Sequence, residues 1–173
     1  TLLSFNKETE IGIVEMGANH KKEIEFLCDI AQPDYGYITN FGKAHLEGFG
    51  GVEGVIIGKS EMYHYLNQNN KKVFVNLDDS IQVEKSEGIG KITFGQKDIN
   101  SIVFIKKVTA NPLVCIEFNQ TEIKSHLIGL YNANNINAAI TIGNYFGISD
   151  NEIKEAIESY IPENNRSQSI EKN

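Results

Sequence analysis

Four polar residues in the first third of the chain have the side-chain chemistry of a binding site: Glu15, Asn40, His45 and Lys59. Glu15 ends an apolar run, Asn40 and His45 belong to a glycine-rich loop over residues 40–51, and Lys59 falls in the helical segment that follows. Ligands of open parallel sheets bind at the carboxyl ends of the strands. If strands precede Glu15 and Asn40, these side chains meet at that edge, and we predict a binding site there.

Each of these residues also has a structural interpretation. Glu15 could be a strand-end carboxylate that caps a nearby helix, although a carboxylate within a buried strand is costly unless it is paired or metal-bound. Asn40 could be a turn residue and His45 a loop histidine without a role. Lys59 on its own could be a solvated helix lysine. The spacing therefore supports a binding-site hypothesis and does not specify the ligand.

A second polar group opens a later helical segment, in the sequence GLYNANNINAA of residues 129–139. Asparagine is a poor residue for a helix interior and a good one for a cap, and a single cap needs only one. Asn132 and Asn135 are three residues apart and share a face, where their amides suit a base or a ribose. The alternative is a capped helix with polar asparagines on its surface.

The elements that must position these residues alternate between strand and helix in the first half of the chain. The hydrophobic pattern predicts strands over residues 11–16, 35–39 and 72–76, with helices over 20–31, capped by Asn19, and 52–66. This order predicts a mostly parallel α/β sheet flanked by helices.

The pattern changes after residue 90. Short strands over residues 91–94, 101–107, 113–118 and 122–127 have no helix between them, so we expect them to pair antiparallel as a small sheet. Helices over residues 132–146 and from Ser149 or Asp150 onward complete the fold. Residues 162–173 are almost wholly polar and are typical of a linker.

Composition excludes several classes of function. The formal net charge of −7 argues against a nucleic-acid-binding protein, which needs a basic face. The two cysteines make neither a disulfide framework nor a zinc site. No apolar run is long enough to span a bilayer and no signal peptide opens the chain, so we expect a cytoplasmic protein. No Walker A motif occurs, since GVIIGKS at residues 54–60 has too few residues between its glycines and lies in a helical pattern.

Three stretches of the sequence resemble the Mur ligase family of ATP-dependent peptide ligases. They are VEMGANHKKEI at residues 14–24, ITNFGKAHLEGFG at 38–50 followed by GKSE at 58–61, and GLYNANNINAA at 129–139. The third looks like the adenine-binding motif of the family, with Tyr131 in place of a frequent histidine. The resemblance runs from about Ile11 to Arg166.

The resemblance implies a role for each candidate residue. Glu15 and His45 look like residues that hold Mg²⁺, and Lys59 looks like the lysine that CO₂ converts to a carbamate, an anionic oxygen donor that suits a hard cation. Asn132 and Asn135 look like contacts of the adenine nucleotide. The cofactor-binding set also takes in Asn40 and, near the junction with a further domain, Arg166. The implied cofactors are ATP and Mg²⁺.

The implied reaction joins D-alanyl-D-alanine to UDP-N-acetylmuramoyl-tripeptide through an acyl phosphate, in the synthesis of the cell-wall precursor. On this interpretation residues 1–161 are a central ATP-binding domain that is incomplete at its N-terminus, and residues 162–173 lead to a missing C-terminal domain. The phosphate-binding loop of the family would precede Thr1. We therefore expect the isolated chain to be inactive. We also expect it to be a monomer.

Two alternatives stay open. The first keeps the fold and changes the substrate, as in another Mur-type amide ligase, a folylpolyglutamate synthase or a cyanophycin synthetase. The loop AHLEGFG at residues 44–50 favours the branch that adds D-alanyl-D-alanine, because relatives often carry an Asp-His loop there. The second is a non-catalytic nucleotide-binding module.

Overall fold

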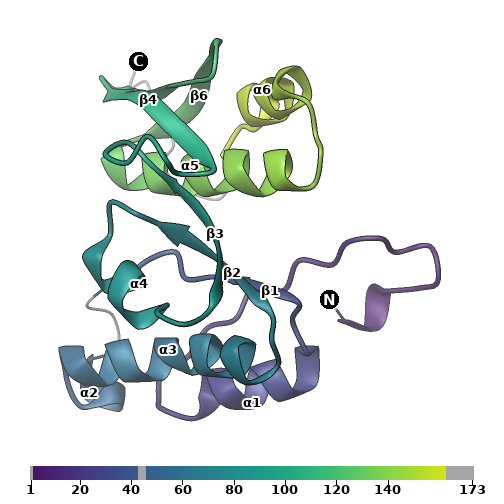
Figure 1. The fold of residues 1–173 in the computed structure, drawn as a ribbon, viewed down its shortest axis with the longest axis vertical. Helices are drawn as coiled ribbons and strands as arrows, with labels where there is room; N and C mark the ends of the chain where they lie inside the picture. Colours follow the sequence, from purple (N-terminus) through teal and green to yellow (C-terminus); the bar gives the residue numbers. More distant parts are fainter. Residues whose placement is uncertain (1, 43–45, 163–173) are drawn as a thin grey trace, which may run out of the picture. The chain divides into compact units, whose positions relative to one another are not determined.

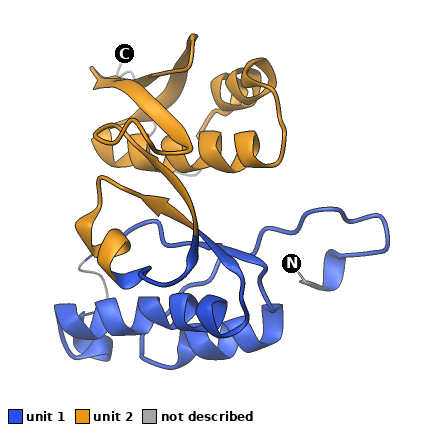
Figure 2. Cartoon of the chain, in the orientation of Figure 1, with its two compact units in different colours: residues 1–73, 85–90 blue, residues 74–84, 91–173 orange. Residues whose placement is uncertain are grey.

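The computed structural model describes residues 2–42 and 46–162 (Figure 1). The chain folds into two compact units (Figure 2): unit 1 comprises residues 1–73 and 85–90, and unit 2 comprises residues 74–84 and 91–173. Helical elements of the described residues are η1 (Leu2–Ser4), α1 (Glu23–Ala31), α2 (Leu46–Phe49), α3 (Val52–Gln68), α4 (Ser80–Lys85), α5 (Leu130–Tyr145) and α6 (Asp150–Ser159). The strands are β1 (Tyr35–Tyr37), β2 (Lys72–Asn76), β3 (Gly90–Gly95), β4 (Val103–Ala110), β5 (Leu113–Phe118) and β6 (Thr121–Ile128).

The strands form a six-stranded mixed sheet in the order β1-β2-β3-β4-β5-β6. Strand β3 pairs parallel with β4, whereas the pairs β4–β5 and β5–β6 are antiparallel. The predicted class, an α/β fold with a small antiparallel part and flanking helices, is confirmed.

One predicted strand pairing is wrong. We expected the strand at residues 91–94 to pair antiparallel with the next one, but β3 and β4 run parallel, with Phe94 opposite Val103 and Gly95 opposite Phe104. Only the last residues of β3 lie beside the first residues of β4. The chain therefore steps sideways and continues in the same direction, so a short loop suffices and no crossover helix is needed.

Unit 1 is built around α3. Helices α1 and α2 pack against it, and so does strand β1 (Figure 1). Val55, Tyr63 and Leu66 of α3 are buried. Gly36 of β1 lies against Leu66 and Met62, where a Cβ atom would come within 2.7 Å of Leu66. The helix therefore presents one apolar face to β1 and leaves its other side to the loop and to α1.

Two predicted features of the N-terminal segment are wrong. Residues 11–16 are not a strand, and Ile13 is 80% exposed. An apolar run indicates a tendency to be buried, but a strand forms only where a neighbouring strand satisfies its backbone groups. Asn19 is not the N-cap of the next helix, because α1 begins later, at Glu23, with Lys22 in the cap position and no side-chain cap of its own.

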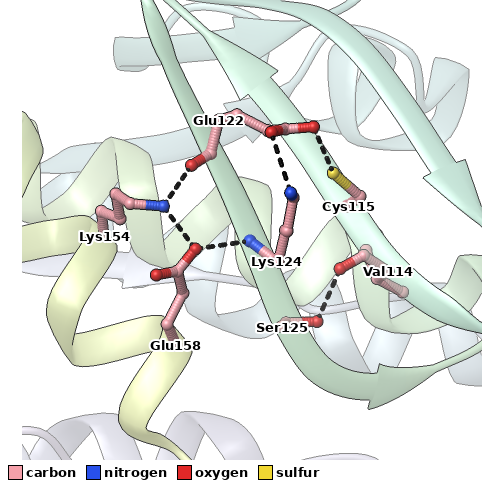
Figure 3. A network of polar contacts seen from close by, with 7 residues as sticks. All are labelled: Val114, Cys115, Glu122, Lys124, Ser125, Lys154 and Glu158. Atoms are coloured by element: carbon pink, nitrogen blue, oxygen red, sulfur yellow. Dashed lines mark hydrogen bonds and ion pairs between the residues drawn. The ribbon is translucent and has the colours of Figure 1, made fainter.

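Unit 2 joins the antiparallel strands to two helices. Helix α5 packs on β4 and β5, and α6 packs on β6. Figure 3 shows how α6 is attached: the Glu158 carboxylate accepts the backbone N–H of Lys124 at 2.8 Å, and the Lys154 ammonium donates to the carbonyl of Glu122 at 2.6 Å. The predicted start of α6 after Ser149 or Asp150 is confirmed: the helix begins at Asp150, and Ser149 is its N-cap in a capping box with Glu152.

Candidate functional site

The loop after β1 is held to helix α3 by Lys59. Its ammonium Nζ donates a hydrogen bond of 2.7 Å to the backbone carbonyl of Asn40. The Asn40 side chain in turn accepts the N–H of Gly42 at 2.8 Å, which closes a tight turn at the start of the glycine-rich loop. The structure therefore brings together two of the predicted site residues that lie far apart in the sequence.

Two glycines of α3 let the loop lie close to the helix. A Cβ atom at Gly58 would stand 2.4 Å from the ring of Phe49, and one at Gly54 would stand 1.8 Å from the Phe49 carbonyl oxygen. Phe49, the last residue of α2, is buried. Gly54 and Gly58 are four residues apart and so share a helix face. Because neither glycine has a side chain, Phe49 packs directly against the backbone of α3 and holds the end of α2 close to this helix.

The environment of Lys59 disfavours its charge. The side chain is half-buried, and burial lowers the pKa of the amine below its ordinary value. A lowered pKa increases the fraction of neutral amine at a given pH. The neutral amine is the form that can act as a nucleophile.

Glu15 does not lie at the end of a strand, as the sequence pattern predicted. The segment around it forms neither helix nor strand, and Glu15 is exposed. The argument from a costly buried carboxylate therefore does not apply to it. Its neighbour Met16 is tied to α1, where the Cys28 thiol contacts the Met16 sulfur at 3.9 Å. His45 lies outside the described residues.

The described residues do not yet form a metal site. Residues 2–42 and 46–162 contain no group of three or more His, Cys, Asp or Glu side chains that could hold an ion. As an ammonium, Lys59 also does not fit, because a positive charge would repel the cation.

The second predicted group lies at the start of α5. Asn132 is buried, and its amide nitrogen donates 2.8 Å to the carbonyl of Ile128 at the end of β6. Asn135 is exposed, and its amide reaches Asn132 Oδ1 at 3.4 Å. Gly129 precedes the helix at φ +87°, a conformation that favours glycine, and a Cβ there would stand 2.8 Å from the Tyr131 ring. Asn132 thus joins the strand to the helix, and Asn135 faces solvent.

Arg166, the last predicted contact, lies outside the described residues. A surface depression of about 670 Å³ occurs in unit 2, between the β5–β6 turn and the start of α6. It is lined by Asn119, Gln120, Thr121, Ser149, Asp150 and Asn151. None of the predicted site residues lines it, so it does not bear on the site.

Sequence reasoning missed two contributions to this site. It gave Gly54 and Gly58 no role, although glycines at this spacing within a helix signal a close approach. It also assigned nothing to Glu61, which stands two residues after Lys59.

The described residues include no helix with the length and hydropathy that a membrane span requires.

The chain is similar to known proteins along most of its length. A family model described as the Mur ligase middle domain matches residues 1–143. The UDP-N-acetylmuramoyl-tripeptide–D-alanyl-D-alanine ligase of Bacillus subtilis is 26% identical over 157 residues, which cover 91% of this chain and 34% of that protein. The ligase of the same name from Buchnera aphidicola subsp. Baizongia pistaciae is 30% identical over 188 residues, covering 100% of this chain and 39% of that protein.

The fold is similar to that of a solved relative. The crystal structure of MurF from Acinetobacter baumannii matches with a TM-score of 0.84 and 26% identity, over 99% of this chain and 39% of that one. The chain therefore spans roughly a third of the length of the relatives that it matches.

Proposed function

The chain belongs to the Mur ligase family, and we propose that it is the central part of a ligase that joins D-alanyl-D-alanine to UDP-N-acetylmuramoyl-tripeptide. The names of the two curated relatives motivate this choice of substrates. The role is in peptidoglycan precursor synthesis, in the cytoplasm. Other Mur-type ligases share the fold, so the substrate is the part of the proposal that most needs a test.

The observation that carries the proposal is the hydrogen bond from the Lys59 ammonium to the backbone carbonyl of Asn40. The amine is half-buried, its pKa is lowered, and it is held where the loop leaves β1. A lysine with these properties is suited to react with CO₂, because the reaction needs the neutral amine. The product is a carbamate, which carries a negative charge and two oxygen donors.

The carbamate, Glu15 and His45 together would supply the ligands of Mg²⁺. Carboxylate-type oxygens are the donors that this ion prefers. When bound, the ion neutralises charge on the phosphates of the nucleotide. Asn40, whose backbone carbonyl accepts the hydrogen bond from Lys59, is the remaining polar residue of the proposed site.

We assign ATP to the α5 end of unit 2. The amides of Asn132 and Asn135 are the donors and acceptors that would contact the adenine nucleotide, with Arg166 as a further contact. Asn132 donates one amide hydrogen to the carbonyl of Ile128, and its Oδ1 accepts from the amide of Asn135. Asn135 is exposed and keeps its amide accessible.

The proposed reaction proceeds in two steps. The γ-phosphoryl group of ATP passes to the peptide carboxylate, which forms an acyl phosphate and releases ADP. The amine of D-alanyl-D-alanine then attacks the acyl carbon, an amide bond forms and phosphate leaves. The contribution of the protein is chiefly to position the reactants and to stabilise charge.

The test is phosphate release from ATP by the product of the complete reading frame that contains this chain. UDP-N-acetylmuramoyl-tripeptide and D-alanyl-D-alanine are supplied together and singly. We expect release that needs both substrates and that falls by at least about a hundredfold in Lys59→Ala. Lys71→Ala, which removes a partly exposed lysine paired with Asp34, is the matched control and retains activity.

The outcomes separate the alternatives. Release that ignores D-alanyl-D-alanine but responds to another amine indicates a Mur-type ligase with a different substrate. Nucleotide binding without any release indicates a non-catalytic module. We further propose that the 173-residue chain alone does not turn over. Ligation by that chain would contradict this part of the proposal.

A further inference from the structure

We infer that Glu61 is a positioning residue, which caps helix α1 from α3 and thereby fixes the segment that carries Glu15. The inference rests on the proposed function only for its consequence in the reaction. Glu61 stands two residues after Lys59 on α3, and both belong to unit 1.

The Glu61 carboxylate satisfies the backbone at the start of α1. One oxygen accepts the N–H of Lys22 at 2.6 Å, and the other accepts the N–H of Glu25 at 3.1 Å. Lys22 is the N-cap residue, in a left-handed conformation with φ 75°, and contributes no side-chain cap. Glu61 therefore performs, from another helix, the task that an N-cap side chain performs locally.

A carboxylate is the right group for this task. The N-terminus of a helix carries a partial positive charge from its aligned peptide dipoles, and a negative side chain is stabilising there. Within the same turn Glu23 accepts the N–H groups of Asn19 and His20, at 2.7 and 3.2 Å. The start of α1 is thus held by two carboxylates, and only that of Glu61 comes from outside the turn.

Helix α1 in turn contacts the segment that carries Glu15. Met16, the next residue, contacts Cys28 of α1, which is fully buried. The turn before α1 also meets the glycine-rich loop, because a Cβ at Gly48 would lie 2.2 Å from the Asn19 carbonyl oxygen. Helix α3 therefore holds the loop through Lys59 and the Glu15 segment through Glu61.

The first test uses the 173-residue chain and needs no activity. Amide hydrogen exchange is measured at Lys22 and Glu25, and methyl-labelled methionine is followed by NMR. The chain has two methionines, so Met16 reports on the Glu15 segment and Met62 reports on the packing of α3 against β1. Glu61→Ala and Glu61→Gln are compared with Glu53→Gln, an exposed glutamate of the same helix.

We expect exchange at Lys22 and Glu25 to be about tenfold faster in Glu61→Ala, and the Met16 methyl signal to move toward that of free methionine. Glu61→Gln gives a smaller change, because its amide has one acceptor for two N–H groups. Glu53→Gln changes neither signal. Unchanged exchange and an unchanged Met16 signal in Glu61→Ala overturn the inference. A loss of the folded Met62 signal in Glu61→Ala would mean that this variant no longer packs α3 correctly. In that case the comparison of Glu61→Gln with Glu53→Gln decides the inference.

The second test uses the product of the complete reading frame. We expect Glu61→Gln to raise several-fold the Mg²⁺ concentration needed for half-maximal ligation, with kcat at saturating Mg²⁺ within about twofold of the unmodified protein. An unchanged Mg²⁺ dependence beside faster amide exchange reduces Glu61 to a simple helix cap and overturns its positioning role. If the unmodified protein makes no product, the proposed function fails, whereas the first test still decides how Glu61 acts.

Discussion

Lys59 Nζ lies 2.7 Å from the backbone carbonyl oxygen of Asn40, so a half-buried amine is held against the loop that leaves β1. A backbone carbonyl accepts this hydrogen bond without supplying a full negative charge. The burial is therefore not offset by an ion pair, and the pKa of the amine is lowered. This differs from the exposed lysines of the chain that pair with carboxylates.

The lowered pKa predicts selective reaction of Lys59 with CO₂. In ¹³C-bicarbonate at about pH 8, we expect a carbamate signal in the NMR spectrum that is lost in Lys59→Arg. Lys71→Arg should retain the signal, because the hydrogen bond from Lys71 to Asp34 raises the pKa of Lys71 and keeps it protonated. A signal that persists in Lys59→Arg would assign the reaction to another amine.

The close approach of Phe49 to Gly58 predicts an unusual response to alanine. An alanine normally stabilises a helix interior relative to glycine by about 1 kcal/mol. Here Gly58→Ala should lower the free energy of unfolding by about 1–3 kcal/mol, because its Cβ would meet the Phe49 ring. Chemical denaturation measures the change.

Phe49→Ala provides the control for that clash. In the Phe49→Ala background, Gly58→Ala should become neutral or stabilising, since the ring is gone. Gly54→Ala should remain destabilising in both backgrounds, because its Cβ would meet the Phe49 backbone carbonyl, which the substitution leaves in place. Equal effects of Gly58→Ala in the two backgrounds would contradict this account.

The two free thiols should react at different rates. Burial, followed by the nearby Asp29 and Glu61 charges, raises the pKa of Cys28 to about 11. Burial and the hydrogen bond to Glu122 also raise the pKa of Cys115, which is only half-buried. The thiolate is the reactive form, so both thiols are slow at neutral pH. With iodoacetamide, we expect Cys115 to be modified first, and Cys115→Ser should remove that faster phase. Faster modification of Cys28 in the folded chain would be inconsistent with its burial.

The attachment of α6 predicts a pH dependence of stability. The hydrogen bond from Lys154, and then the backbone N–H of Lys124, lower the pKa of Glu158 from 4.5. The folded-state pKa is thus below the unfolded one, so this stabilisation is fully present above about pH 4.5 and is lost as the pH falls through the folded-state pKa. Glu158→Gln should flatten the loss of stability below that pH, measured by thermal unfolding between pH 6 and pH 3. Glu155→Gln, at an exposed position of the same helix, should leave the profile unchanged.

The hydrophobic pattern of the sequence determined most of the elements. Strand β2 lies where it was predicted, and α3 and α6 begin where predicted, because alternating and helical apolar spacings reflect local geometry and Ser149 supplies its own cap. The family was also readable from short motifs. Tertiary structure decided what those patterns do not encode: the parallel pairing of β3 with β4, and the absence of a strand at residues 11–16.

The same division holds for the candidate site. The residue types of Glu15, Asn40 and Lys59 were visible in the sequence, but the contact of Lys59 with the Asn40 carbonyl joins residues that are far apart in the chain. Asn19 had the composition of a helix cap, yet the cap of α1 is Glu61, which lies on another helix. Local propensity ranks the residues next to a helix end. Only the folded chain decides which distant side chain reaches its free N–H groups, because that depends on how the helices pack.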